Sequence, residues 1–598
     1  MKLSQTLAIT LSILSVNTHA VENTSANSIP KIISKAAQLA PYSKRDITDE
    51  VFYFVLPDRF YNANSTNDLG ANKNDTKRAL SRGGFDKTNK GMYHGGDLQG
   101  LTEKLPYLDE MGITAIWLTP ILRNKAMQSG SSGYHGYWIL DFTEIDPHLG
   151  TNAELKSFID KAHQRNIKVF FDIIANHTAD VIKYKECHGD DGLGWIITSQ
   201  DKEKNSGCPY ISTTELLQGK HYTTVIPKGE EQIKSPAWLN NTKYYHNQGD
   251  STWQGESAQN GDFAGLDDIK TEDAFVLDGF IDIYNQIIDE FKPDGFRIDT
   301  VKHVNIEFWQ KFSPALIKHA KQKGINNFFM FGEVYSADPK YLSQFTTTGK
   351  MQSVLDFGFQ QAMVDTLINQ QGTNKLAALF AQDHFYNDND SNANQLVNFI
   401  SNHDMGRFAY MLKQSKYHYN EHDRLARVKL ASALMFFSRG VPVIYYGDEQ
   451  GFVGDGGDQA ARQDMMPSKV ASYNDDDLLA TNKTTADNNF DQSHPLYKTF
   501  SDFAKLYQQY PLLRHGKQTT IYSQNKVGLF VIEKSDITTK NNALKNLLIM
   551  VNTDTKSHEF TLDNNNNYQK IYGGKIKKNS PNTVIKIAPL SFAIFQQN

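Results

Sequence analysis

Cysteine is scarce in this chain: Cys187 and Cys208 are the only two among its 598 residues. Two thiols are too few for a structural zinc site, which takes four ligands. In an oxidising compartment a pair of cysteines is more typical of a disulfide than of a reactive thiol. We therefore expect one disulfide, which would close a loop of 20 intervening residues.

Long basic runs and apolar stretches long enough to cross a bilayer are also missing. Lys and Arg number 62 against 67 Asp and Glu, for a formal net charge of −5, which argues against nucleic acid as a partner. The apolar run at residues 7–16 is too short for a membrane span. With Lys2 before it and Ala20 after it, this run predicts a signal peptide. No cysteine lies near the cleavage site, so we expect no lipid anchor in the membrane. With the signal peptide removed, we expect a soluble monomer that is secreted or periplasmic.

What the chain does have is a recurring pattern of apolar segments with helical patterns between them. Residues 151–166 read as a helix because Thr151 and Glu154 form a capping-box pattern at its start. Residues 100–112 read as another helix, which ends at Gly112. Eight strands alternating with helices predict an α/β fold, a (β/α)8 TIM barrel. The expected strands are residues 51–57, 114–121, 167–174, 295–299, 328–334, 353–357, 396–401 and 442–446.

Two segments depart from this alternation. Residues 178–271, rich in Gly, Asn and Lys, follow the third strand and are too long for plain coil, so they predict a subdomain or lid. From about residue 510, short β segments predict an appended antiparallel β-sandwich. The predicted organisation is a signal peptide at 1–20, a polar leader at 21–49, the first part of the barrel at 50–177, an excursion at 178–271, the second part of the barrel at 272–509 and a C-terminal β domain at 510–598.

The stretch DGFRIDTVKH, residues 294–303, carries the first chemical signal. Alternation along the expected strand places Arg297 and Asp299 on the same face. A guanidinium beside a buried carboxylate favours the ionised form and lowers the pKa of the carboxylate, which suits a nucleophile better than a general acid. Lys302 and His303 follow just past the strand end, where they can reach a substrate. The alternative is a structural Arg–Asp pair that closes the strand.

Three other strand ends carry similar groups. The third ends in D-x-x-x-N-H at residues 172–177, the fifth carries Glu333 in FGEVY, and the seventh carries His403 and Asp404 in FISNHD. Catalytic groups of such a barrel lie at the C-terminal ends of its strands. A single Asp at a strand end is structural more often than catalytic. Four such matches in order resemble the α-amylase family, glycoside hydrolase family 13, and the resemblance, from about residue 50 to the C-terminus, implies the same layout of barrel, excursion and β domain.

Cleavage of a glycosidic bond with retention of configuration needs an ionised carboxylate and a protonated carboxylic acid about 5–5.5 Å apart. The neighbouring Arg297 suits Asp299 to the ionised role. The apolar strand around Glu333 favours the uncharged, protonated form of that side chain. The resemblance implies the same two roles, and it implies that Asp404 is a third carboxylate that binds sugar hydroxyls and helps to distort the ring.

The resemblance also implies a set of substrate-binding residues. The segment YHGYW, residues 134–138, is similar to the family segment that walls the cleavage subsite. By that match Tyr137 stacks on the sugar, His135 is a lesser candidate, and Trp138 belongs to the core. The histidines of the third and seventh strand ends would bond glucose hydroxyls, although each could be an ordinary strand-end histidine. The expected set is Tyr137, His135, His177, Arg297, Lys302, His303 and His403.

Calcium is the expected cofactor, at one or two sites. The resemblance implies a first site between barrel and excursion, held by Asn176, Asp268 and the His303 carbonyl, with Asp267 as an alternative to Asp268. Closely spaced oxygen side chains in a turn indicate a second, because they are ligands for hard cations. This second site resembles the extra site of cyclodextrin glucanotransferases and some bacterial amylases, and the alternative is a solvated Asn-rich turn. Its expected ligands are Asn62, Asn64, Asn67, Asp68, Gly95 and Asp97.

The resemblance implies a retaining enzyme that cleaves internal α-1,4-glucosidic bonds in starch, glycogen or maltodextrins. The alternatives are an α-glucan transglycosylase, a cyclodextrin- or pullulan-degrading member of the family, and an inactive glucan-binding protein. Against the last, Asp299, Glu333 and Asp404 are all present. Cyclising transferases carry an aromatic ring at the position matched by Ala264, which favours hydrolysis here, although Phe263 is one register away.

Overall fold

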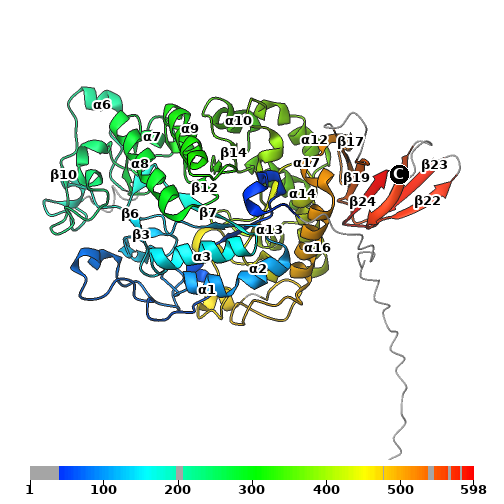
Figure 1. The fold of residues 1–598 in the computed structure, drawn as a ribbon, viewed down its shortest axis with the longest axis horizontal. Helices are drawn as coiled ribbons and strands as arrows, with labels where there is room; N and C mark the ends of the chain where they lie inside the picture. Colours follow the sequence, from blue (N-terminus) through cyan, green and yellow to red (C-terminus); the bar gives the residue numbers. More distant parts are fainter. Residues whose placement is uncertain are drawn as a thin grey trace, which may run out of the picture.

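The computed structural model describes residues 39–196, 207–475, 477–536, 544–562, 568–579 and 582–597 (Figure 1). The predicted signal peptide and most of the polar leader therefore lie outside the described residues. A central barrel carries the excursion at one end of the molecule and the C-terminal β strands at the other (Figure 1). Within the described ranges, no helix is long and apolar enough to cross a membrane.

Eight parallel strands form the barrel, as predicted. Their order is β14-β13-β12-β7-β2-β1-β16-β15, and a parallel bridge between Leu355 and Val397 joins the two edge strands. Every residue of these strands is buried, which explains why most of them are rich in apolar residues. The strands are β1 Phe52–Val55, β2 Ala115–Leu118, β7 Lys168–Ile173, β12 Gly295–Ile298, β13 Phe329–Gly332, β14 Ser353–Val354, β15 Val397–Asn398 and β16 Val441–Tyr445.

Helices lie between the strands, with two local departures from the sequence pattern. The expected helix at residues 100–112 is split at Lys104, because the ring of Pro106 clashes with the preceding turn and its nitrogen cannot donate. The Thr151 hydroxyl caps α3 by accepting from the Glu154 N–H, whereas the Glu154 carboxylate accepts from that same hydroxyl. The helices of the barrel are α1 Leu98–Glu103, α2 Leu105–Met111, α3 Asn152–Gln164, α8 Ala274–Phe291, α9 Ile306–Gln322, α10 Pro339–Thr347, α11 Phe357–Met363, α12 Asn374–Phe380, α13 Phe408–Lys413, α14 Glu421–Phe437, α15 Ala471–Asn474, α16 Pro495–Gln509 and α17 Pro511–His515.

Short elements and the predicted Cys187–Cys208 disulfide hold the excursion after β7 together. Its last strand, β11, pairs antiparallel with β8, which places Asp268 opposite His177. The excursion therefore returns to the end of β7, beside the expected catalytic residues. Its elements include β8 His177–Thr178, β9 Lys183–Tyr184, α4 Lys185–His188, α6 Thr213–Leu217, β10 Thr224–Val225, α7 Ser257–Asn260 and β11 Asp267–Asp268; before α3 lie β3 Leu122–Asn124, β4 Met127–Gln128, β5 Ser131–Ser132 and β6 Ile139–Ile145.

The C-terminal strands form two antiparallel sheets, in the orders β17-β18-β19-β24-β21 and β20-β23-β22. Val531 and Met550 of the larger sheet share one buried cluster with Ile585 of the smaller, as expected of a sandwich. Phe592 packs on Phe437 and Phe503 of the barrel helices at ring-centroid distances of 5.5 and 5.2 Å. The strands are β17 Lys517–Tyr522, β18 Leu529–Ser535, β19 Leu547–Asn552, β20 His558–Leu562, β21 Tyr568–Tyr572, β22 Lys575–Asn579, β23 Asn582–Ile587 and β24 Ser591–Gln597.

Candidate active site

A cavity of about 510 Å³ lies at the C-terminal ends of the barrel strands, where the excursion meets the barrel. Every predicted catalytic and substrate-binding residue except Arg297 lines this cavity. Most of these residues come from the segments that directly follow β7, β12, β13 and β15. They are Asp299, Glu333, Asp404, Tyr137, His135, His177, Lys302, His303 and His403.

Arg297 is buried and joins three carboxylates. Its Nη1 lies 2.8 Å from Oδ1 of Asp299 and 2.8 Å from Oδ1 of Asp172, and its Nη2 lies 2.9 Å from Oε2 of Glu333. Asp172 is adjacent because it pairs with Arg297 in the register of β7 and β12. The side chains of Asp299 and Glu333 remain 9% and 11% exposed, so a ligand in the cavity can reach both. The barrel thus gathers the two expected catalytic carboxyl groups on one guanidinium.

The protonation of this cluster differs from the prediction. Burial raises the pKa of Asp299 well above its usual range; Arg297 acts in the opposite direction, and the neighbouring carboxylates add to the rise. Burial likewise raises the pKa of Asp172 to about 7. Arg297 lowers the pKa of Asp299 as predicted, but the expected net lowering was wrong, because burial and the carboxylates of Glu333 and Asp172 outweigh the guanidinium. The cluster therefore retains a proton near neutral pH.

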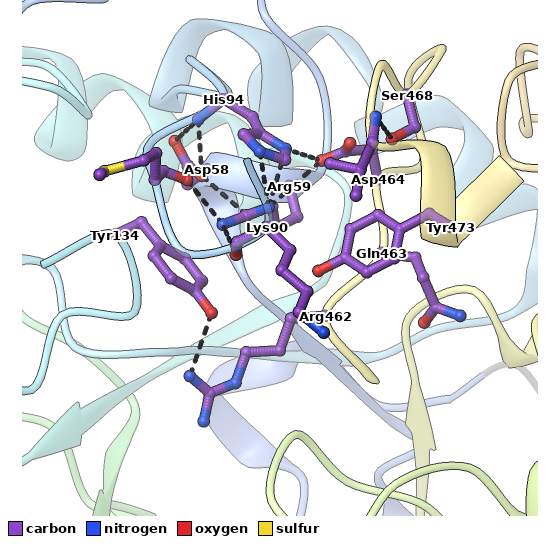
Figure 2. A network of polar contacts seen from close by, with 12 residues as sticks. Asp58, Arg59, Lys90, His94, Tyr134, Arg462, Gln463, Asp464, Ser468 and Tyr473 are labelled. Atoms are coloured by element: carbon purple, nitrogen blue, oxygen red, sulfur yellow. Dashed lines mark hydrogen bonds and ion pairs between the residues drawn. The ribbon is translucent and has the colours of Figure 1, made fainter. Parts of the chain in front are cut away.

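Asp404 lies at the more open side of the cavity, with a side chain that is 42% exposed. Its Oδ1 is 3.2 Å from Nη2 of Arg462 and 3.5 Å from Nε2 of His403. Arg462 belongs to the loop after β16 and was not predicted, because this irregular loop carries no periodic pattern. Figure 2 shows Arg462 directed toward Tyr134, whose hydroxyl accepts from Nη1 of Arg462 at 3.2 Å.

The buried histidines of the cavity are neutral. Burial lowers the pKa of His177 to about 3 and holds those of His135 and His403 well below the usual range. Nε2 of His177 and Nδ1 of His403 have no hydrogen-bond partner in the part of the chain that the structure describes. A neutral imidazole can both donate and accept, and an unpaired buried polar atom is costly. These two rings are therefore suited to bond the hydroxyl groups of a ligand.

Tyr137 is held in the cavity by polar contacts with Asp172 and His403. Its hydroxyl donates to Oδ2 of Asp172 at 3.1 Å and lies 2.8 Å from Nε2 of His403, and its ring is nearly parallel to the His403 ring. This orientation leaves Tyr137 at the cavity wall, beside the carboxylate cluster. Trp138, expected in the core, is half-buried and also lines the cavity.

An aromatic wall that was not predicted completes the cavity. Phe263 stacks on His177 at a centroid distance of 5.3 Å, and Trp253 meets Phe263 edge-on at 4.7 Å. Tyr335, two residues after Glu333, is 53% exposed and lines the cavity as well. Neither Trp253 nor Tyr335 follows from strand periodicity, whereas the position of Phe263 next to Ala264 was a usable signal.

The backbone segments that carry Asn176 and Asp268, expected at the first calcium site, lie side by side. Asn176 and Asp268 are both buried, and the N–H of Ile269 donates to the Asn176 carbonyl at 2.9 Å. Nδ1 of His246 is 2.6 Å from Oδ2 of Asp268. Although burial opposes a charged imidazole, the carboxylates of Asp268 and Glu272 raise the pKa of His246 to about 9. Asn176 and Asp268 are oxygen donors that suit Ca²⁺, but backbone carbonyls and water must complete six to eight ligands.

The alternative ligand Asp267 is already engaged. It accepts from the N–H groups of Val181 and Ile182 and from Nζ of Lys234, the last at 2.5 Å. Asp268 is therefore the better candidate of the two. The ring of His303 is turned so that its Nδ1 lies 2.6 Å from the Ala258 carbonyl. No cluster of three or more His, Cys, Asp or Glu side chains suited to a metal occurs within the described ranges.

The second expected calcium site is a compact turn with an unsatisfied oxygen. Oδ1 of Asn67 is buried and has no hydrogen-bond partner among the residues that the structure describes. Gly95 has a φ of +87°, and a Cβ added there would lie 2.4 Å from Oδ1 of Asp68, so the turn closes tightly on this carboxylate. Burial raises the pKa of both Asp68 and Asp97. The side-chain oxygen of Asn64, by contrast, already accepts hydrogen bonds from the N–H and hydroxyl of Thr66. Both oxygens of Asp97 also accept from backbone N–H groups, of Gly100, Ala63 and Asn64. Asn67 and Asp68 are therefore the side chains of this turn that best fit a hard cation.

Comparison with known proteins decides the family. A family model described as α-amylase, catalytic domain, matches residues 54–516, which is most of the chain. The chain belongs to the α-amylase family. An α-amylase of Streptomyces lividans is 42% identical over 534 residues, which cover 85% of this chain but only 56% of that relative. The chain thus spans little more than half of this relative's length.

Solved structures of the α-amylase family show the same fold. An Anoxybacillus α-amylase superposes with a TM-score of 0.67 and 26% identity, over 93% of this chain and 99% of that one. CldA, described as a cyclomaltodextrin glucanotransferase with a three-domain ABC distribution, superposes with a TM-score of 0.68 and 25% identity, over 92% of this chain and 99% of that one. The fold is therefore shared by relatives named for hydrolysis and for transfer.

We expect the neutral state of His177 to reduce stability as the pH falls. Its pKa is about 3 when folded against 6.5 when unfolded, so between these values only the unfolded chain takes up the proton, and stability falls with decreasing pH. From pH 7.5 to pH 5 this costs about 2 kcal/mol. His177→Gln should remove this cost. Between pH 7.5 and pH 5, the free energy of unfolding measured in urea should therefore rise by about 2 kcal/mol in the variant relative to wild type.

His422→Gln is the matched control, because the side chain of His422 is 89% exposed. This variant should keep the same stability relative to wild type at both pH values. A His177→Gln variant whose relative stability does not change with pH would mean that His177 is charged in the folded protein.

Proposed function

We propose that this protein is a retaining endo-acting glycoside hydrolase that cleaves α-1,4-glucosidic bonds in starch, glycogen or maltodextrins. The observation that carries the proposal is the grouping of Asp299 and Glu333 on the Arg297 guanidinium inside the cavity. The 42% identity to the Streptomyces lividans α-amylase supports the choice of substrate.

The proposed reaction has two displacements. A carboxylate oxygen of Asp299 attacks C1 of the sugar while Glu333 gives its proton to the departing glycosidic oxygen, which leaves a glycosyl ester on Asp299. Glu333, now ionised, then takes a proton from water, the water oxygen attacks C1, and Asp299 is released with its charge restored. Two inversions at C1 give net retention of the α configuration. Asp404 binds sugar hydroxyls and favours the distorted ring of the transition state.

The charge balance of the site is preserved under this division of roles; because the pKa of Asp299 is raised, the proton that the cluster retains must lie on Glu333 when Asp299 attacks. Arg297 can compensate one ionised carboxylate of the cluster fully, and it lies within 2.9 Å of both Asp299 and Glu333. As Asp299 loses its charge in forming the ester, Glu333 gains one, so the guanidinium faces about the same total charge throughout. The neutral His177 and His403 can donate to sugar hydroxyls without adding a positive charge that would oppose an oxocarbenium-like transition state.

Transfer to a second sugar is the alternative outcome of the same chemistry. The exposed rings of Trp253 and Tyr335 line the cavity and could hold an acceptor glucan. CldA, which has the same fold, is described as a glucanotransferase. A time course of products on starch, pullulan and cyclodextrin separates the candidates: hydrolysis raises reducing ends from the start, whereas cyclisation does not.

Calcium at both expected sites and export from the cell belong to the proposal. The buried, unpaired Oδ1 of Asn67 beside Asp68 supports the second site. A cation there would compensate the buried carboxylates, and one at Asn176 would pin the excursion to the barrel. The disulfide supports an oxidising compartment, and the predicted signal peptide supports the route to it. We further propose a monomer without a membrane anchor, with domain boundaries at 178, 272 and 510.

We expect Asp299→Asn and Glu333→Gln each to abolish nearly all hydrolysis while the fold stays intact, because each removes one of the two carboxyl groups that the reaction requires. Azide should rescue an Asp299→Gly variant by attacking C1 in place of the carboxylate and should yield a β-glucosyl azide. Starch hydrolysis and product analysis provide the measurement. Glu307→Gln, on the exposed face of α9, is the control and should retain wild-type activity. Near-normal turnover in either active-site variant would contradict the assignment of the two catalytic carboxyl groups.

Removal of calcium should lower both the melting temperature and the activity. A cation that binds only the folded protein adds about 2.7 kcal/mol at a hundredfold excess over its dissociation constant. Ca²⁺ should restore both properties after chelation, and Mg²⁺ should not, because Mg²⁺ requires a smaller octahedral site. Asn176→Ala should abolish the activity response to chelation, whereas Asp68→Ala should mainly lower the melting temperature.

Asp86→Ala, at an exposed acid outside both expected ligand sets, is the control for these calcium variants. It should leave the response to chelation unchanged. If metal analysis detects no bound calcium and the chelator leaves melting unaltered, both sites are wrong, and the roles of the carboxylates are unaffected.

A further inference from the structure

A network of polar contacts runs from Arg462, the ion-pair partner of Asp404, to Arg59 in the turn that follows β1 (Figure 2). Its outer member is Arg462, whose Nη2 pairs with Oδ1 of Asp404 at 3.2 Å. The same guanidinium donates through Nε to the His403 carbonyl at 3.1 Å and through Nη1 to the Tyr134 hydroxyl at 3.2 Å. It also pairs with Oδ1 of Asp458 at 2.6 Å. Arg462 is thus shared between two carboxylates, and its Nε and Nη1 contacts set how Nη2 meets them.

Tyr134 provides a contact that is itself immobilised. Its ring is buried, and the Arg59 guanidinium lies over the ring face at 3.9 Å from the centroid, a favourable cation–π distance. Arg59 in turn pairs with Oδ2 of Asp58 at 2.9 Å and donates to the carbonyls of Lys90 and Met92 at 3.0 and 2.7 Å. The Tyr134 hydroxyl therefore projects from a rigid support.

The loop that carries Arg462 is attached to the same support. The N–H of Met465 donates to the Arg59 carbonyl at 2.8 Å, and Oδ1 of Asp464 lies 2.6 Å from Nδ1 of His94 (Figure 2). Both contacts follow Arg462 by two or three residues in the chain. The backbone of the loop is therefore fixed against the turn that follows β1, and Nη2 of Arg462 contacts both Asp404 and Asp458.

Asp458 and Asp404 compete for that side chain. The side chain of Asp458 is 68% exposed and its contact is the shorter of the two. Among the described residues, the other side-chain contact of Asp404 is with His403 at 3.5 Å, and burial lowers the pKa of His403 so that this ring is neutral. Without a contact that holds Nη1, the guanidinium can turn toward Asp458 and leave the Asp404 carboxylate without a cationic partner.

We propose that Tyr134 is a positioning residue for the reaction: its hydroxyl holds Arg462 in the orientation that keeps the Asp404 carboxylate directed at the bound sugar. The inference rests on the proposed function, because it takes Asp404 as the carboxylate that stabilises the distorted ring. Tyr134 itself touches neither the sugar nor the reacting atoms. Tyr134 acts on the contact between Asp404 and the distorted sugar of the transition state. Loss of its hydroxyl should therefore lower kcat more than it changes KM.

The test is Tyr134→Phe, alone and combined with Asp404→Asn. The substitution keeps the ring on Arg59 and removes only the hydroxyl, so the variant should fold. We expect kcat on a maltooligosaccharide to fall about tenfold while KM changes less than about twofold. In the Asp404→Asn background the second substitution should have almost no further effect on kcat, because no carboxylate remains to be positioned.

Tyr473→Phe is the matched control: it removes a buried hydroxyl that donates to the Gln459 carbonyl in the same loop. It should match wild type in kcat, and melting curves should show all variants folded at the assay temperature. Unchanged kcat in Tyr134→Phe, or an equal loss in both backgrounds, would overturn the positioning role alone while wild type remains active. A wild-type protein that cleaves no α-1,4-glucan would overturn the proposed function together with this role.

Discussion

A single guanidinium shared by three buried carboxylates is the interaction on which the site depends. If Asp172, Asp299 and Glu333 were all ionised, Arg297 would leave two buried negative charges uncompensated, and each such charge costs several kcal/mol. The cluster therefore favours a state that holds a proton, which is reflected in the raised pKa values of Asp299 and Asp172. Retaining glycoside hydrolysis requires this mixture, one carboxylate able to attack and one acid able to protonate the leaving group.

The barrel divides the work between rigid strands and the loops above them. β7, β12 and β13 are neighbours in the sheet, so their register alone places Asp172 beside Arg297 and brings the segment with Glu333 next to it. Groups that meet the rest of the substrate come from longer connections: the excursion supplies Phe263, and the loop after β16 supplies Arg462. Such a division allows loops to change specificity while the strand ends keep the chemistry.

The parts of the structure that depend on local pattern were predictable, and those that depend on three-dimensional neighbours were not. All eight barrel strands could be found because buried parallel strands are continuous apolar runs, and Asp299 and Glu333 because they end such runs. The raised pKa of Asp299 was missed because burial outweighs Arg297, and because Glu333 and Asp172 reach the same guanidinium only through the register of β7, β12 and β13. Arg462 was missed because its irregular loop offers no period. The roles of the expected site residues and the calcium ligands remain predictions.

The most direct test of the central claim is the configuration of the sugar end that the reaction creates. Proton NMR can follow a maltooligosaccharide during the first minutes of cleavage, before the anomers interconvert in solution. If Asp299 and Glu333 act as a nucleophile and an acid on one guanidinium, the first product must carry the α-anomer. Initial formation of the β-anomer would contradict the account, because it would require water to attack directly and would leave Asp299 without its nucleophilic role.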